Sequence, residues 1–521
     1  MIIDLNKVEN PEKFFKKFDL CIVGAGAAGI AIAQNLNSEK FSICLIEAGG
    51  EDYSYESQKR YDGNWTNEIF GQKQNIGNRL LSDRLRYFGG TTNHWTGRCR
   101  RFDQTDFKKR SWIPNSGWPI QLKDLITYYK KAENILDLNF LDYDAELNDS
   151  NCIGDFFRKR EFSFSQPTRM GNKYKRILND SKNLTVVLNC NFKKLKYTES
   201  KENISGVICS NYKKNEFIIL SDEVILATGG IENTRILLNE SLNRPINKTN
   251  LGRYFMGHAI WKTGEFFYSN NFDITSYLTT INESLLTCVM KDSRRFYRKV
   301  KVRLGQKKLD PAVVYKQNRS NQSFFSLDEL AQEKLKLPNM GVTLESEYNP
   351  TNLDLSYYSV LKSTRKLDYS SLGCRTLLLR AEQVPDFNST ISLSNEKDQF
   401  GLIKADVKWT MNNIDYDSVR KFNQYLNLDL IKTKLGFIKN NFDINEIPNK
   451  LWSGAHHLGG TRMSNNSSNG VVDKNLKVFG FNNLYVAGSS VFPTSGLANP
   501  TLTIVALSLK LADHIKRKIN S

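Results

Sequence analysis

The chain has 521 residues, of which 40% are hydrophobic and 25% are charged, a globular composition that is long enough for two domains. It contains no run of about 18 apolar residues, so we predict no transmembrane segment, and its first residues lack the apolar core of a signal peptide. The net charge of +18 raises a basic binding protein for nucleic acid or an anionic surface as an alternative. Because the lysines are spread along the whole chain, we expect no nucleic-acid partner.

The 8 cysteines are scattered and form no CxxC pair. This pattern argues against a disulfide framework, a metal site or a c-type haem, and it favours reduced, buried thiols in a cytoplasmic protein. The densest basic block, at 294–303, is predicted to be a solvated face, with a docking patch for an acidic partner as the alternative.

The N-terminal region has the pattern of a dinucleotide-binding unit. Its parts follow in chain order: a strand at Asp19–Val23, a GxGxxG turn at Gly24, Gly26 and Gly29, a helix at Ile30–Leu36, a strand at Phe41–Ile46, and Glu47. The glycines permit a tight turn close to a pyrophosphate, and Glu47 can accept hydrogen bonds from ribose hydroxyls. The motif alone does not separate FAD from NAD.

A loop rich in Gly and Thr is predicted at Tyr87–Gly97. It holds an aromatic residue, an amide and His94, which could pack against a flat ring. The alternative is a Gly-rich turn around a buried Trp95.

The middle of the chain alternates between the two predicted domains. Residues 111–185 are mixed and rich in helix, and 183–195 and 204–209 are predicted strands. A strand at 222–228 runs into Gly229 and a helix at 231–238, so the dinucleotide domain resumes there. Residues 259–451 alternate in strand fashion between polar loops and end in helical segments. We therefore expect an inserted substrate domain.

The C-terminal region combines two adjacent histidines with a helix start. His456 and His457 precede Gly459-Gly460-Thr461, and neutral imidazole is the usual general base near neutral pH. Asn499-Pro500-Thr501 opens an apolar helix whose start carries free N–H groups and a partial positive charge. The alternatives are a structural histidine pair and an asparagine that only caps the helix.

Together these motifs resemble the glucose–methanol–choline (GMC) oxidoreductase family of FAD flavoproteins over nearly the whole chain. The resemblance is carried by the glycine motif with Glu47-Ala48, GGTTNHW at Gly89–Trp95, ATGGIENTRILL at Ala227–Leu238, LGRYFMGH at Leu251–His258, QVPDFNSTISLS at Gln383–Ser394, and the C-terminal HHLGGTRM and ANPTLTIVAL.

The resemblance implies catalytic roles. His457, in His-x-x-Gly-Thr, matches the family's catalytic histidine and would take the substrate hydroxyl proton. Asn499 matches its partner and would hold the alcohol oxygen, while hydride passes to flavin N5. The implied FAD-binding residues are Gly24, Gly26, Gly29, Glu47, Ala48, Gly90, Thr91, Asn93, His94, Phe192, Ala227, Gly229, Gly488, Ser489, Asn499, Pro500 and Thr501.

Three of these positions depart from the common pattern or add to it. Phe192 stands where a small apolar residue lies near the adenine, and Gly488 stands where many members have an acidic residue. The latter, with FPTSGLANPTLT, resembles the pyranose oxidase branch. His94 matches the position at which that branch attaches FAD covalently, so we expect it either to bond the flavin or to lie against its ring.

The predicted fold class is α/β: a Rossmann-type FAD-binding domain with a discontinuous α+β substrate domain built on an antiparallel sheet. The FAD-binding domain is predicted at 1–110, 186–258 and 452–521, and the substrate domain at 111–185 and 259–451.

The predicted function is oxidation of a CH–OH group in a sugar, polyol or other alcohol. A redox-neutral lyase with the same fold and a nicotinamide dehydrogenase are alternatives. The sequence does not name the substrate, the oligomeric state or the electron acceptor, which could be oxygen, a quinone or a cytochrome.

Overall fold

The computed structural model describes residues 1–277, 321–347, 373–440 and 451–521, apart from positions 10, 77–78, 140, 166–167, 201, 245, 248, 270–271 and 452. The basic block at 294–303 and Cys288 lie outside the described residues. The helices are α1 Ala27–Asn35, α2 Tyr55–Gln58, α3 Arg79–Ser82, α4 Gln104–Phe107, α5 Ile126–Ile135, α6 Met170–Asp180, α7 Gly230–Glu240, α10 Glu329–Leu335, α12 Asn413–Lys432 and α14 Thr501–Asn520.

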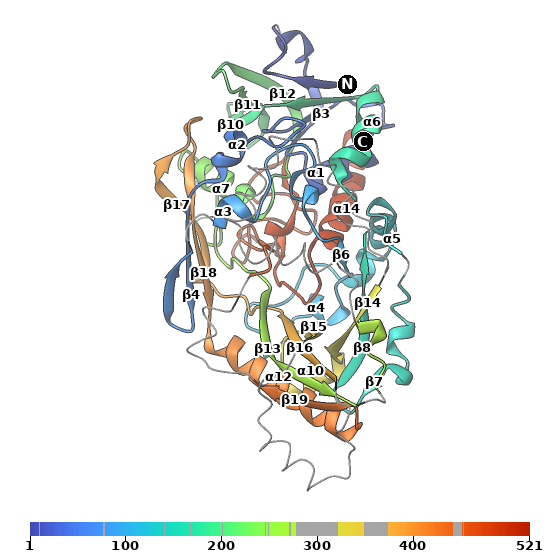
Figure 1. Cartoon of the computed structure of the whole chain (residues 1–521). Coiled ribbons are helices and arrows are strands. Elements are labelled where there is room, and N and C mark those ends of the chain that lie inside the picture. Colours follow the sequence, from blue (N-terminus) through green and yellow to red (C-terminus); the bar gives the residue numbers. More distant parts are fainter. Residues whose placement is uncertain are drawn as a thin grey trace, which may run out of the picture.

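The strands form three sheets (Figure 1). They are β1 Ile2–Asp4, β2 Phe18–Val23, β3 Ile43–Ile46, β4 Asn64–Ile69, β5 Gln72–Asn75, β6 Arg98–Cys99, β7 Cys152–Ile153, β8 Phe157–Phe164, β9 Leu184–Leu188, β10 Asn191–Tyr197, β11 Ile204–Ser210, β12 Glu216–Leu226, β13 Ala259–Tyr268, β14 Asn321–Leu327, β15 Met340–Glu347, β16 Gly373–Ala381, β17 Thr390–Lys397, β18 Ile403–Met411, β19 Gly436–Asn440 and β20 Leu484–Val486.

The first sheet contains the predicted dinucleotide unit. Strands β1, β9, β3, β2 and β12 lie side by side in parallel, and β20 joins β12 at the far edge. The central strands β2 and β3 are apolar and almost fully buried, as is typical of parallel strands covered on both faces. Helix α1 crosses from β2 to β3, and α14 packs beside α1. The region 18–47 thus folds as the sequence predicts.

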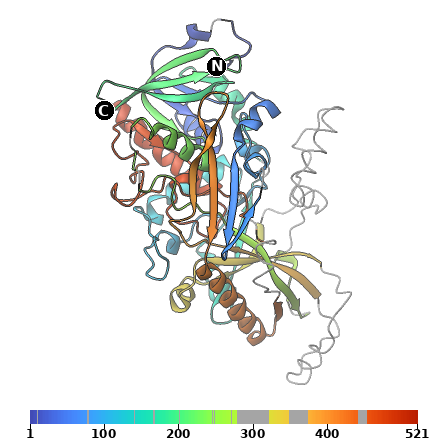
Figure 2. The same cartoon turned by 90° about the vertical axis from the view of Figure 1, so that its left-hand side faces the viewer.

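Strand β12 extends this sheet in a second direction. Its last part, from Ser221, pairs in parallel with β2 and β20, while its first part pairs antiparallel with β11. Strand β11 pairs in turn with β10. Both chain termini lie at this end of the molecule in both views (Figures 1 and 2).

The second sheet is antiparallel, in the order β19-β13-β16-β15-β14-β8-β6, with β7 on β8. One face is apolar and packs on α12, where Phe325, Val342 and Leu379 join Phe422 in a single core. On the opposite face, Phe162 and Phe324 form a small cluster with Leu497. Because Leu497 precedes α14, this second face looks toward the C-terminal segment and the first sheet.

The third sheet, β17-β18-β4-β5, runs along one side of the molecule between the other two (Figure 2). Its strands come from distant parts of the chain, since β4 pairs in parallel with β18. The sequence analysis did not predict this sheet. Strand β5 reads QKQN and has no apolar alternation that would mark it as a strand.

Strand pairing crosses the predicted domain bounds in two places. Strands β4 and β6 lie within 1–110, yet they pair with β18 and β8 of the predicted substrate regions. Helices α5 and α6 lie within 111–185, yet they pack on α14 and α1. The division into two domains at those residue numbers stays a prediction, whereas the predicted α/β fold class with its antiparallel substrate sheet is confirmed.

Two further features concern the whole described chain. Among the described residues, no helix combines the length and apolar character needed to cross a bilayer. The described cysteines are free thiols, of which Cys152 is exposed and the others are buried.

Candidate active site

Seven of the predicted cofactor residues lie at one edge of the first sheet. They directly follow the carboxyl ends of β2, β3, β12 and β20: Gly24, Glu47, Ala48, Ala227, Gly229, Gly488 and Ser489. The strand register aligns these ends, because Val23 pairs with both Ile46 and Leu226, and Leu226 pairs with Val486. Ligands of open parallel sheets bind at this edge.

The three motif positions require glycine for different geometric reasons. A Cβ on Gly24, at φ +107°, would lie 2.6 Å from the Ala227 carbonyl oxygen, and one on Gly29 would lie 1.9 Å from that of Gly24. These two glycines allow strand, turn and helix to pack closely. A Cβ on Gly26 would meet nothing within 4 Å. The open space at Gly26 is therefore where a pyrophosphate can approach the backbone and the start of α1.

Glu47 is buried beneath the same turn. Its Oε2 accepts a hydrogen bond from the Ala25 N–H at 3.0 Å, and its Oε1 accepts one from the Gly49 N–H at 2.9 Å. Burial raises the pKa of this carboxyl, while those backbone N–H groups oppose the rise. Glu47 therefore shapes the turn itself. Its predicted bond to a ribose uses the remaining lone pairs and stays a prediction, as does contact of the buried Phe192 with adenine.

The Gly-rich loop covers this turn. A Cβ on Gly90, at the start of a 3₁₀ helix spanning Gly90–Asn93, would lie 3.0 Å from the Gly26 Cα. The Asn93 amide donates to the Phe88 carbonyl oxygen at 2.9 Å, and Thr91 is exposed. Burial lowers the pKa of His94 to about 4. The loop thus places Gly90 against Gly26 and holds His94 neutral.

Asn499 does not cap the helix that follows it. Helix α14 begins at Thr501, and Pro500 occupies the cap position without a side-chain cap bond. Within the described residues, the Asn499 Oδ1 is buried and accepts no hydrogen bond. A buried amide oxygen without a partner carries a desolvation cost that a ligand can remove. This geometry argues against the capping interpretation.

The buried His457 side chain lies beside two aromatic rings. Its ring lies 5.6 Å from that of Trp65 and is stacked 6.2 Å from that of Phe255. Its Nε2 lies 4.0 Å from Asp83 Oδ2 and has no hydrogen-bond partner within the described residues. Its backbone packs on the sheet edge, because the Ser489 hydroxyl donates to the His457 carbonyl oxygen at 2.6 Å.

The neighbouring histidine is held differently. His456 Nδ1 lies 2.7 Å from His258 Nδ1, and His258 Nε2 lies 3.0 and 2.9 Å from the carbonyl oxygens of Ser495 and Gly496. Carbonyls only accept, so neutral His258 carries its proton on Nε2 and accepts through Nδ1. His456 must then donate from Nδ1. Its Nε2 is left with a free lone pair, and the ring is only partly buried.

All three histidines are held in the neutral form. Burial lowers the pKa of His457 to about 3, with Asp83 opposing this shift and Arg84 and Arg79 adding to it. Burial lowers the pKa of His258 to about 4 and that of His456 well below its usual value. His456 and His457 therefore have a nitrogen lone pair that can accept a proton, but they are weak bases until a ligand changes their surroundings, whereas both ring nitrogens of His258 are already in hydrogen bonds.

FAD fits these residues. The open backbone at Gly26 suits a pyrophosphate, and the unpaired polar atoms of His457 and Asn499 suit a polar ring system or its substrate. Gly229 and Gly488, at φ +91° and +122°, leave the backbone clear at the adjoining strand ends. The predicted residues that follow β2, β3, β12 and β20 thus lie at adjoining strand ends, and their contacts with FAD stay a prediction.

Sequence reasoning missed several residues near the histidines. Asp83, Trp65 and the partner role of His258 carried no local signal, since each reaches the site from a distant segment. Only LGRYFMGH, which ends at His258, could have drawn attention to that residue.

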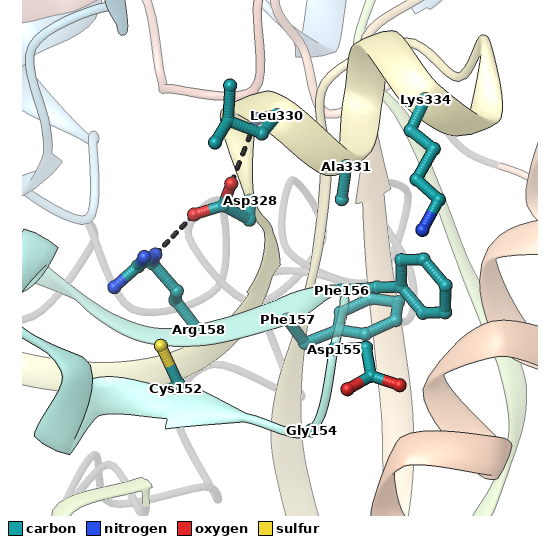
Figure 3. Close-up of a pocket in the computed structure, with 10 residues that line it drawn as sticks. All are labelled: Cys152, Gly154, Asp155, Phe156, Phe157, Arg158, Asp328, Leu330, Ala331 and Lys334. Carbon is teal, nitrogen blue, oxygen red and sulfur yellow. Dashed lines mark hydrogen bonds and ion pairs between the residues drawn. The ribbon is translucent and has the colours of Figure 1, made fainter.

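A separate hollow of about 210 Å³ lies between β7, β8 and α10 (Figure 3). Asp328 there accepts from the Leu330 N–H at 2.8 Å and pairs with Arg158, while Lys334 lies 5.2 Å from the Phe156 ring. None of the predicted site residues lines it. It is not the candidate active site.

Comparison with known proteins agrees with the motifs. Residues 385–508 match the family model of the GMC oxidoreductases. The fructose dehydrogenase large subunit of Gluconobacter japonicus is 33% identical over 135 residues, which are 26% of this chain and 24% of that protein. The 2-methyl-1,2-propanediol dehydrogenase of Mycolicibacterium austroafricanum is 29% identical over 166 residues, or 30% and 28% of the two chains. The matches thus span about a quarter of these relatives.

Solved structures share the fold over nearly the whole chain. Formate oxidase is 16% identical with a TM-score of 0.57, covering 97% of this chain and 99% of the other. Pyridoxine 4-oxidase from Mesorbium loti is 14% identical with a TM-score of 0.57, covering 96% and 99%. A structure of Aspergillus oryzae formate oxidase is titled for FAD modification, in agreement with the FAD predicted here. The C-terminal part of the chain, residues 385–508, is thus similar to the GMC oxidoreductases, and the whole chain shares the fold of the two solved oxidases.

Proposed function

We propose that this protein is an FAD-dependent oxidoreductase that oxidises a CH–OH group of a small alcohol, polyol or sugar. The observation that supports it most is that His457, whose backbone packs on the carboxyl edge of the dinucleotide sheet, and Asn499, just before α14, each hold a buried polar atom with no hydrogen-bond partner among the described residues. When bound, FAD accepts the hydride. The remaining chemistry belongs to the protein side chains.

The reaction needs a group that takes the hydroxyl proton. As the C–H bond breaks with its electron pair, the O–H proton leaves to a base and the carbonyl forms, so atoms and electrons balance. His457 is the base predicted from the motif, and its orphan Nε2 supports that role. Asn499 would hold the alcohol oxygen and keep its C–H bond directed at the cofactor.

His456 is a second candidate for the same base. Its acceptor nitrogen is fixed by the hydrogen-bond chain through His258 to two backbone carbonyls, the arrangement in which a third group orients a base. Among the described residues, no hydrogen bond orients the His457 ring in this way, and Asp83 Oδ2 lies 4.0 Å from its Nε2. The two residues are adjacent in sequence, so single variants can assign the role.

The test is anaerobic reduction of the bound flavin, followed by its visible absorbance across a panel of sugars, polyols and simple alcohols. Bleaching by one class would support oxidation and narrow the substrate. His457→Ala and His456→Ala should both retain FAD, and the variant that lacks the base should reduce flavin roughly 10²–10⁴ times more slowly. Unchanged reduction in His457→Ala would remove it from that role.

Product analysis separates the rival functions. An aldehyde, ketone or keto-sugar means oxidation, whereas conversion without net oxidation means the redox-neutral lyase. Reduction of added NAD would point to a nicotinamide dehydrogenase. Re-oxidation by air or only by a dye then distinguishes an oxidase from a dehydrogenase.

A further inference from the structure

Two buried arginines lie on the face of the antiparallel sheet that looks toward the active site. Arg98 on β6 is 8% exposed, and Arg380 on β16 is 7% exposed. The Arg98 Nη2 donates to Gln322 Oε1 at 2.6 Å, and the Arg380 Nη1 donates to Thr343 Oγ1 at 2.6 Å. Their hydrogen bonds are therefore to neutral groups.

Strand register places both side chains on this face. Arg98 is paired with Phe164, two residues from Phe162, and the guanidinium lies 5.5 and 5.4 Å from the rings of Phe162 and Phe164. Phe162 stacks on Phe324 and contacts Leu497, two residues before Asn499. Because side chains alternate along a strand, Arg98 lies on the same sheet face as Phe162. This face contacts Leu497, which belongs to the segment that carries Asn499.

Arg380 reaches the same region from the neighbouring strands. It is paired with Ile260, two residues after His258. A Cβ on Gly454 would lie 2.8 Å from Ile260 Cδ1 and 3.1 Å from His456 Nδ1, so Ile260 and His456 border the same spot. The positive charge of Arg380 also contributes to lowering the pKa of His456, as does that of Arg98.

These two arginines lack the carboxylate partner that most other buried arginines of the protein have. Seven buried arginines form such ion pairs: Arg60, Arg79, Arg84, Arg100, Arg110, Arg160 and Arg235. In the part of the chain that the structure describes, neither Arg98 nor Arg380 forms one. The Glu345 carboxylate is close enough to raise the pKa of both arginines, which opposes the effect of burial. It accepts a hydrogen bond from the Thr343 hydroxyl at 3.0 Å.

The physical consequence is a site with excess positive charge. Burial lowers the pKa of Arg380 to about 9, and the charge of Arg98 lowers it further. The Arg98 Nε is buried and has no hydrogen-bond partner among the described residues. Arginine retains its proton even when buried, so a bound anion would offset the positive charge that Glu345 leaves uncompensated.

We propose that Arg98 and Arg380 form an anion subsite, and that the substrate is a hydroxy compound carrying a carboxylate or phosphate near the oxidised CH–OH group. The inference rests on the proposed function for the identity of the reacting group. The anion subsite itself rests only on the sheet face and its charges. A guanidinium matches both carboxylate and phosphate oxygens, so the two kinds of anion share this recognition.

Binding is tested on the FAD-loaded protein with anions that cannot be oxidised. Acetate and inorganic phosphate, titrated separately at constant ionic strength against chloride, should perturb the visible flavin spectrum in a saturable way. The stronger of the two identifies the preferred anion. Arg380→Gln and Arg98→Gln should each raise the Kd about ten- to hundredfold, the value of a lost hydrogen bond to a charged group. Arg380→Lys should retain part of the affinity.

Arg176→Gln is the matched control, since that side chain is 94% exposed and its loss changes the net charge equally. Its Kd should equal that of the wild type, and an equal Kd in all four variants would overturn the subsite. The wild type alone provides a second readout, because the preferred anion should raise its melting temperature more than chloride does. No rise at saturating anion, together with no spectral change, would also overturn the subsite.

Flavin reduction by anionic and neutral substrates tests the anion subsite separately from the proposed function. D-gluconate and D-glucose 6-phosphate, compared with D-glucose, should reduce the flavin with at least tenfold higher kcat/KM, and Arg380→Gln should lose that preference through KM. Reduction by neutral alcohols with no anion preference would leave the proposed function standing and overturn the inference. Anion binding without reduction by any CH–OH compound would support the subsite and count against the oxidation.

Discussion

Replacing Gly26 by alanine tests whether the turn after β2 holds a pyrophosphate. Gly26 has φ −88° and ψ −163°, which alanine adopts without strain, and an added Cβ meets no protein atom within 4 Å. The free energy of unfolding of the FAD-free protein should therefore change by less than about 1 kcal/mol. The added methyl would instead occupy the space into which the phosphates must come to reach the backbone N–H groups.

The expected cost falls on FAD binding. Losing one hydrogen bond to a charged phosphate costs about 1.5–3 kcal/mol, which raises the Kd for FAD about ten- to hundredfold. Fluorescence titration of the FAD-free protein gives the Kd, and thermal melting gives the stability. Gly29→Ala provides the contrast, because its Cβ would lie 1.9 Å from the Gly24 carbonyl oxygen and should destabilise the fold itself. An unchanged Kd for FAD in Gly26→Ala would refute the assignment of this turn.

Three further predictions concern single side chains. If His94 bonds the flavin, the flavin should remain with the wild-type protein after acid precipitation and should be released from His94→Ala. Yellow flavin in the supernatant of the wild type would argue against the bond. Asn499→Ala should slow flavin reduction roughly 10²-fold with little change in melting temperature, since Asn499 makes no cap bond. A large loss of stability with near-normal reduction would restore the capping role. Glu232 is buried against Arg84 and Arg235, which lower the pKa of its carboxyl to about 2. Its ion pairs should therefore add about 3 kcal/mol to the free energy of unfolding above pH 4.5, and this contribution should be lost as the pH falls toward 2. Glu232→Gln should weaken that pH dependence in denaturant titrations, and an unchanged pH profile would contradict the ion-pair account.

The sequence could predict the cofactor edge because its signals are local. In a parallel sheet, the residue after each strand lies at the same edge, so finding the strands before Gly24, Glu47, Ala227 and Gly488 is enough to bring those residues together. The structure confirms this expectation through register alone.

The substrate side could not be predicted in the same way. His258 and His456 are separated by 198 positions, and their contact depends on how β13 meets the C-terminal loop. Arg98 and Arg380 reach one face from strands that are far apart in the sequence, and β6 has only two residues. No period or motif marks such contacts, because they follow from the pairing order of the antiparallel sheet.

The cofactor edge and the substrate side therefore differ in how their buried charges are neutralised. Around the cofactor edge, the Glu47 carboxylate accepts hydrogen bonds from backbone N–H groups, and the Glu232 carboxylate pairs with two arginines, so both of these charges have partners within the protein. On the substrate side, the histidines are neutral and the two arginines are not offset by an ion pair in the described chain. When a histidine takes the substrate proton, a further positive charge arises beside those arginines. An anionic group on the substrate would offset part of this positive charge, which ties the chemistry of the base to the identity of the substrate.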